Sequence, residues 1–75
     1  MNRTEALSKL IEITTDHTDV HGNRLGRGFF LTEAVKALGD FDRAVRSIRA
    51  LTNAGRVRCT SVQIGGTFHD LYAAA

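Results

Sequence analysis

The chain contains no proline and no tryptophan, and Cys59 is its single cysteine. One cysteine cannot form an internal disulfide, which favours a reducing compartment. We expect Cys59 to be a small buried hydrophobe in a strand. No apolar run approaches the roughly 20 residues of a membrane-spanning helix, and the N-terminus lacks the core of a signal peptide. These absences predict a cytoplasmic protein.

The sequence is short, and its charge is unevenly distributed. Its 75 residues predict a single domain over residues 1–75, with a small core that a homodimer, formed through the N-terminal helix, would help to stabilise. The formal net charge is only +2, yet five of the eight arginines lie between Arg43 and Arg58. Because local charge matters more than its sum, nucleic acid is a candidate partner.

No catalytic motif stands out in the sequence. A nucleophile–base pair, paired carboxylates on one element and a glycine-rich phosphate motif are all missing, so an enzyme is the least expected class. We therefore expect no catalytic residues and no cofactor.

The stretch from residue 16 to residue 28 combines histidines, acids and three glycines. Its possible metal ligands are Asp16, His17, Asp19 and His21. Without cysteines at ligand spacing this is a weak metal signal, and the glycines disfavour a helix that would align the four side chains. We expect a solvent-exposed loop with a tight turn at residues 22–23 and no metal. Contact of Arg24 and Arg27 with a phosphate backbone is the alternative for this loop.

Apolar spacing predicts helices in the first two thirds of the chain. Asn2 and Glu5 have the spacing of a capping pair, and the apolar stripe that follows ends near residues 14–15. The residues of this stripe are Ala6, Leu7, Leu10, Ile11 and Ile13. A second helical face, spaced i, i+3, i+4 and i+7, consists of Leu31, Ala34, Val35 and Leu38. Gly39 ends that helix, and Asp40 or Asp42 is expected to cap the next one.

The helix after Gly39 has two chemically different faces at ~100° per residue. One face is apolar and consists of Ala44, Val45, Ile48 and Leu51. Of these, Ile48 and Leu51 are predicted to be buried between the helices and the hairpin. The opposite face is Arg46, Arg49, Ala50 and Asn53, with Arg43 and Ser47 at its borders. Arginine and asparagine can make bidentate contacts with guanine and adenine edges. The alternative is an ordinary solvated helix surface, since arginine is also a good helix former.

The period of the sequence changes after Gly55. Polar and apolar residues alternate from Arg56, and Gly65–Gly66 is typical of a two-residue hairpin turn. The alternation slips at Thr60–Ser61, which predicts a bulge or an early strand end there. The return strand is expected at residues 67–72, and residues 73–75 are expected to fray.

These features together resemble the winged helix-turn-helix family over about two thirds of the chain. The resemblance assigns Gly28–Phe30 to a short strand, Thr32–Leu38 to the second helix and Arg43–Ala54 to the recognition helix. The exit at residues 54–57 and the hairpin after it would be the wing. The expected fold class is therefore α+β, a small winged helix with three helices and a C-terminal β-hairpin. The sequence departs from the family in a turn after Gly39 that is about one residue short, and in two acids near the recognition helix, Asp40 and Asp42.

The resemblance implies sequence-specific binding of double-stranded DNA by a small transcriptional regulator of phage, plasmid or other mobile-element type. The residues expected to face the major groove are Arg43, Arg46, Ser47, Arg49 and Asn53. Those expected to flank it through the wing are Arg56, Arg58, Gln63 and Thr67. The alternative is a winged helix that binds protein, or a small inhibitor, with its arginine face on an acidic or nucleic-acid-binding partner.

Overall fold

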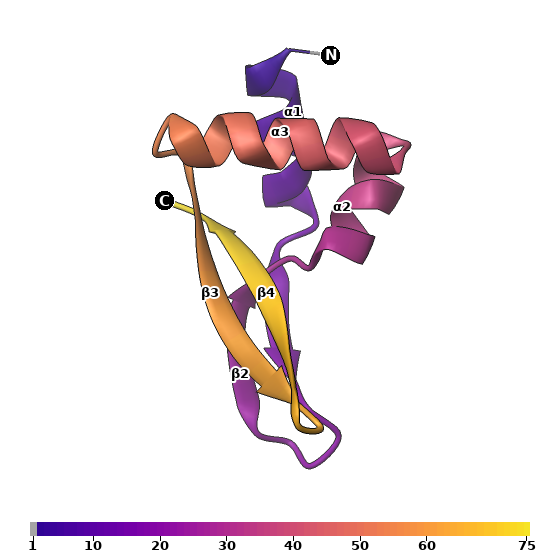
Figure 1. Cartoon of the computed structure of the whole chain (residues 1–75), viewed down its shortest axis with the longest axis vertical. Helices are drawn as coiled ribbons and strands as arrows, with labels where there is room; N and C mark the ends of the chain where they lie inside the picture. Colours follow the sequence, from indigo (N-terminus) through magenta and orange to yellow (C-terminus); the bar gives the residue numbers. More distant parts are fainter. Residues whose placement is uncertain (1) are drawn as a thin grey trace.

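The computed structural model describes residues 2–75 as three helices and two β-hairpins (Figure 1). The helices gather at one end of the molecule: α1 (Arg3–Glu12), α2 (Leu31–Leu38) and α3 (Phe41–Asn53). The hairpins extend away from them: β1 (Thr15–Thr18) with β2 (Arg24–Gly28), and β3 (Val57–Ile64) with β4 (Thr67–Ala74). The chain is therefore a small α+β protein in which a C-terminal antiparallel hairpin follows the helices. This is the predicted winged-helix-like arrangement.

The helices begin and end close to the predicted signals. The side chain of Asn2 accepts a hydrogen bond from the Glu5 N–H (2.8 Å), and α1 ends slightly earlier than predicted, at Glu12. Gly39 ends α2 with a φ of 101°, a left-handed conformation that glycine adopts without a steric penalty. Asp40 then caps α3, which starts and ends a little earlier than the predicted range Arg43–Ala54. Local capping chemistry therefore defines this helix pair.

The core lies where the three helices meet the start of the second hairpin. Its largest fully buried side chains are Phe29, Leu10, Leu38 and Leu51. Ile48 and Leu51 are buried as predicted, and Val57 joins the same cluster from β3. One residue of the predicted apolar stripe departs from the prediction, because Ile11 is 51% exposed.

Residues 16–28 form a β-hairpin, so the predicted loop is wrong. β1 and β2 pair antiparallel from Thr15–Gly28 to Thr18–Arg24, with an irregularity after His17. The turn falls near the predicted position, because the Asp19 carboxylate accepts hydrogen bonds from the backbone N–H groups of His21 and Asn23 (both 2.9 Å). Glycine-rich strands have low β propensity, which is why the local sequence favoured a loop.

Two glycines of the first hairpin allow it to pack against the second. A Cβ at Gly28 would lie 2.1 Å from the Tyr72 carbonyl oxygen, and one at Gly26 would lie 3.2 Å from a Leu71 methyl. Phe29 then forms a single-residue bridge with Tyr72 through two backbone hydrogen bonds (2.8 and 2.9 Å), in place of the predicted strand Gly28–Phe30. The glycines therefore mark close backbone approach.

The second hairpin is longer and more regular than predicted. Gly65 and Gly66 both have positive φ, as the predicted type I′ turn requires. The register is unbroken from Val57–Ala74 to Ile64–Thr67, so the predicted bulge at residues 60–61 is wrong. The alternation slips because Val57 is buried against the helices, whereas Val62 lies on the opposite face, which it shares with Leu71.

The C-terminal residues and Cys59 also differ from the prediction. Ala73 and Ala74 pair with β3, and the Ala75 N–H donates to the Arg56 carbonyl (2.9 Å), so this end is an ordered strand. Backbone pairing needs no large side chain, and a run of alanines gave no local sign of it. Cys59 is exposed because the helices cover its face of the hairpin only at the base, near Val57.

Candidate nucleic-acid interface

The helix α3 is fixed in place by its apolar side and by its first turn. Ala44, Ile48 and Leu51 are buried on that side. At its N-terminus, Asp40 Oδ1 accepts the Arg43 N–H at 2.7 Å. The helix crosses in front of α1 near one end of the molecule (Figure 1), and its other, open side carries the exposed residues Arg46, Arg49 and Asn53. Side chains on that open side are therefore presented by a firmly packed element.

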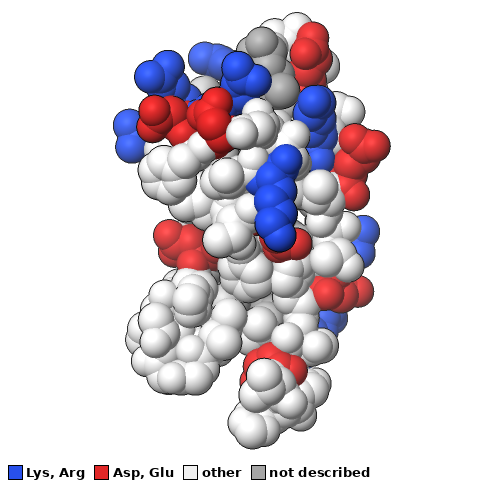
Figure 2. All heavy atoms as spheres, turned by 90° about the vertical axis from the view of Figure 1, so that its right-hand side faces the viewer, with Lys and Arg blue, Asp and Glu red and all other residues white. Residues whose placement is uncertain are grey.

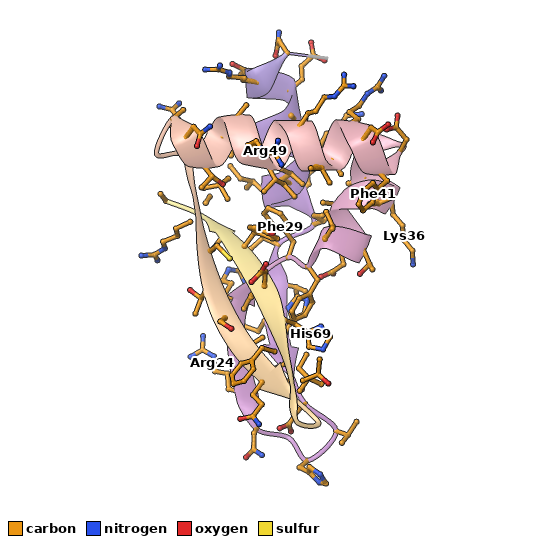
Figure 3. The ribbon with its side chains drawn as sticks, in the orientation of Figure 1. Arg24, Phe29, Lys36, Phe41, Arg49 and His69 are labelled. Carbon is orange, nitrogen blue, oxygen red and sulfur yellow. The ribbon has the colours of Figure 1, made fainter. Side chains whose placement is uncertain are left out.

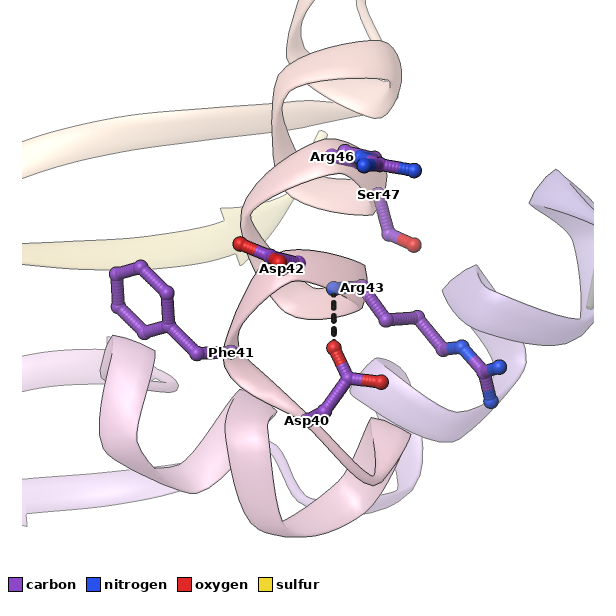
Figure 4. Close-up of a pocket in the computed structure, with 6 residues that line it drawn as sticks. All are labelled: Asp40, Phe41, Asp42, Arg43, Arg46 and Ser47. Atoms are coloured by element: carbon purple, nitrogen blue, oxygen red, sulfur yellow. Dashed lines mark hydrogen bonds between the residues drawn. The ribbon is translucent and has the colours of Figure 1, made fainter.

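The open side brings together all five residues predicted to face the major groove. Arg43, Arg46, Arg49 and Asn53 are exposed, and Ser47 is half-buried. Two shallow depressions meet at Arg46. The first is lined by Asp40, Phe41, Asp42, Arg43, Arg46 and Ser47 (Figure 4). The second is lined by Arg3, Arg46, Arg49, Ala50, Asn53 and Ala54. We call the exposed side chains of Arg3, Arg43, Arg46, Arg49 and Asn53 the arginine face.

Arg3 is the member of this face that the sequence did not reveal. It belongs to the first turn of α1, yet it lines the same depression as Arg46, Arg49 and Asn53. No local pattern distinguishes it, because its position beside α3 depends on how the two helices pack. Arg3 also shares a neighbouring depression with Arg56, which places that predicted wing residue at the edge of the arginine face.

The charges of the arginine face are not neutralised within the described chain. Across residues 2–75 the ion pairs are His17–Glu33 (2.7 Å) and Arg24–Asp16 (3.3 Å), both in or beside the first hairpin. Figure 2 shows the basic atoms gathered around the α3 end, with acidic atoms among them. No basic atom is visible on the two lobes at the bottom of that view. On the face drawn in Figure 2, arginine and lysine side chains therefore gather at the helical end, interspersed with acids.

The remaining predicted wing residues do not form one surface. Gln63 pairs with Phe68, and the next pair is Ile64–Thr67, so Gln63 and Thr67 point to opposite faces of the hairpin. Arg58 lies on the same face as Thr67, opposite to Gln63. All three are exposed. The wing therefore has one arginine near its base and no basic side chain toward its tip.

The first hairpin does not extend the arginine face. Arg24 pairs with Asp16 and lies on the hairpin, well away from Arg49 on α3 (Figure 3). His17 is engaged through both ring nitrogens, with Nε2 2.7 Å from Glu33 Oε1 and Nδ1 2.9 Å from the Thr15 carbonyl. Within residues 2–75, no three His, Cys, Asp or Glu side chains converge to hold a metal ion.

Comparisons of the chain with protein-family models, with curated proteins and with solved structures found no match. Its likeness to the winged-helix family thus remains a prediction that rests on the order and geometry of its elements. None of the helices within residues 2–75 is long and apolar enough to cross a membrane.

Proposed function

We propose that the protein binds double-stranded DNA by placing α3 in the major groove. The observation that carries this proposal is the arginine face: three α3 arginines without ion-pair partners in residues 2–75, on a helix anchored by its opposite side, with Arg3 and Arg56 beside them. Specific binding by a domain of this size suits a small transcriptional regulator.

The dimensions and chemistry of α3 fit this role. Its 13 residues make a rod of roughly 20 Å, and the major groove, about 12 Å wide, admits an α-helix. Arginine recognises the O6 and N7 atoms of guanine, and asparagine those of adenine, N6 and N7. The arginines of this face can also contact phosphates. Such contacts are favourable at moderate salt because they release counterions from the DNA.

The flanking contacts differ from those expected for a basic wing. The tip of the second hairpin carries no arginine or lysine, whereas Arg3 and Arg56 adjoin α3 directly. We therefore assign the flanking phosphate contacts to these two arginines, and at most a single hydrogen bond to either Gln63 or Thr67, which lie on opposite faces of the hairpin.

The test is an equilibrium titration of labelled random duplex at several salt concentrations. Neutralisation of about four phosphates should give a slope near −3.6 for log K against log salt. Arg46→Ala and Arg49→Ala should each weaken binding, and a phosphate-contacting arginine should lower the slope by about one unit. Arg24→Ala removes the same charge from the first hairpin and is the matched control, which should leave affinity and slope nearly unchanged.

A protein partner is the second candidate, and one observation favours it. Phe41 is 58% exposed beside Asp40 and Asp42 at the start of α3, and an exposed aromatic side chain is typical of protein interfaces. If random duplex is not bound at low salt, the DNA proposal fails and the protein-partner proposal takes its place. If the Arg46→Ala and Arg24→Ala variants bind duplex equally well, Arg46 does not contribute to DNA binding, and the placement of α3 in the groove is wrong.

A further inference from the structure

Asp42 lies on the same side of α3 as the arginines, although an acid is unfavourable near DNA phosphates. Arg46 follows it at i+4 and Arg49 at i+7, which places the three side chains along one stripe of the helix. Asp42 is exposed and occupies the first turn of α3. The helix dipole favours an acid in the first turn, but that effect does not require it to be on this stripe.

The two acids at the start of α3 have different roles. Asp40 is the N-cap, and its Oδ1 is occupied by the Arg43 N–H. In residues 2–75, Asp42 makes neither a side-chain hydrogen bond nor an ion pair, although Arg46 is at a favourable ion-pair spacing. Figure 4 shows the Asp42 carboxylate and the Arg46 guanidinium extending in opposite directions. Both groups are therefore available to a ligand.

The floor of the major groove offers a suitable partner for a carboxylate. Cytosine presents only an N4 amino donor there, whereas guanine presents two acceptors and adenine presents an acceptor beside its donor. A carboxylate, which only accepts hydrogen bonds, is therefore best matched to cytosine. In helix-turn-helix proteins, the N-terminal residues of the recognition helix are those that contact base edges. Asp42 occupies that part of α3.

We propose that Asp42 and Arg46 read bases, with Asp42 accepting from cytosine N4 and Arg46 donating to guanine O6 and N7. This proposal rests on DNA binding by α3. Four residues of helix separate their Cα atoms by about 6 Å along the axis, roughly two base-pair steps. The target site should therefore contain a cytosine and a guanine a short distance apart, at defined positions.

The test is selection from a random duplex pool by the full chain, followed by sequencing of the bound duplexes. The wild-type protein should enrich one cytosine position that Asp42→Asn converts to adenine, because asparagine pairs with the N6 and N7 atoms of adenine. The change in preference should be roughly 5- to 150-fold. Arg46→Ala should lose the preference for guanine at a second position. Asp40→Asn removes the same charge two residues earlier and keeps the cap, so its motif should equal that of the wild type.

The possible failures are distinguishable. If Asp42→Asn keeps the wild-type motif and tightens binding to every duplex as much as Asp40→Asn does, Asp42 only repels phosphate, and base reading is wrong while DNA binding stands. If the wild-type protein enriches no duplex at low salt, DNA binding itself is wrong, and base reading fails with it. Circular dichroism of each variant confirms that it remains folded.

Discussion

The contact between the two hairpins can be broken by adding one methyl group, in the variant Gly28→Ala. Gly28 is the glycine outside the positive-φ set, so alanine suits its backbone conformation. Its new Cβ, however, would lie 2.1 Å from the Tyr72 carbonyl oxygen and 3.3 Å from a Leu71 methyl. Because the closer atom belongs to the backbone of β4, the first hairpin and β4 must move apart.

The cost follows from the hydrogen bonds lost in that movement. The adjoining Phe29–Tyr72 bridge contains two backbone hydrogen bonds, of 2.8 and 2.9 Å, at a buried position. Breaking each of these two bonds costs about 1–3 kcal/mol, because it leaves backbone groups unsatisfied. The smaller entropy of the unfolded alanine chain returns about 0.4–1 kcal/mol. A net loss of roughly 3 kcal/mol is expected, which corresponds to a fall in Tm of about 10–25 °C for a domain of this size.

Thermal melts and amide hydrogen exchange would measure this effect. The control is Gly22→Ala at the tip of the first hairpin, where φ is +83° and the added Cβ would have no heavy atom within 4 Å. That variant should lose only about 1–2 kcal/mol of left-handed backbone strain and keep the Phe29 and Tyr72 amides protected. Gly28→Ala should lose their protection. A Gly28→Ala protein that melts with the parent and keeps these amides protected would refute the close packing of the hairpins.

Three further predictions concern the core, the first turn and the thiol. Leu51→Ala should lower the free energy of unfolding by about 2–4 kcal/mol, because the side chain is 2% exposed, and a melt that overlays the parent would contradict its burial. The backbone N–H of Asn23 lowers the pKa of Asp19, so the turn should be stabilised while the carboxylate is ionised and loosen as pH falls through that lowered pKa. The NMR chemical shifts of the His21 and Asn23 amides should change during acidification, because both amides donate to Asp19. Constant chemical shifts would contradict this role of Asp19. Desolvation, and after it the Asp70 carboxylate, raises the pKa of Cys59, so Asp70→Asn should speed alkylation of the thiol at about pH 8. An unchanged rate would exclude the influence of Asp70.

Helices and tight turns were predictable because the features that define them are close together in the sequence. The apolar spacing from Leu31 to Leu38, the cap at Asp40 and the Gly65–Gly66 turn each depend on interactions within a few residues. Periodicity also separated the buried and open sides of α3, and this separation placed the predicted groove-facing arginines together.

Other features depended on contacts between distant parts of the chain. The first hairpin packs on Leu71 and Tyr72 through Gly26 and Gly28. Because glycine has no side chain, the sequence pattern does not indicate that contact. The buried face of the second hairpin also could not be read from the sequence. Val57 is buried against the helices on one face, whereas Val62 and Leu71 are buried on the other face, nearer the tip. In the candidate interface, only the packing of α1 on α3 brought Arg3 beside Arg46. The sequence by itself determined the helices, the turns and the chemistry of the α3 face, because these are local properties of the chain. Tertiary structure alone decided which distant residues join that face and which strands pair, because those choices depend on shape and on backbone hydrogen bonds that side-chain patterns do not record.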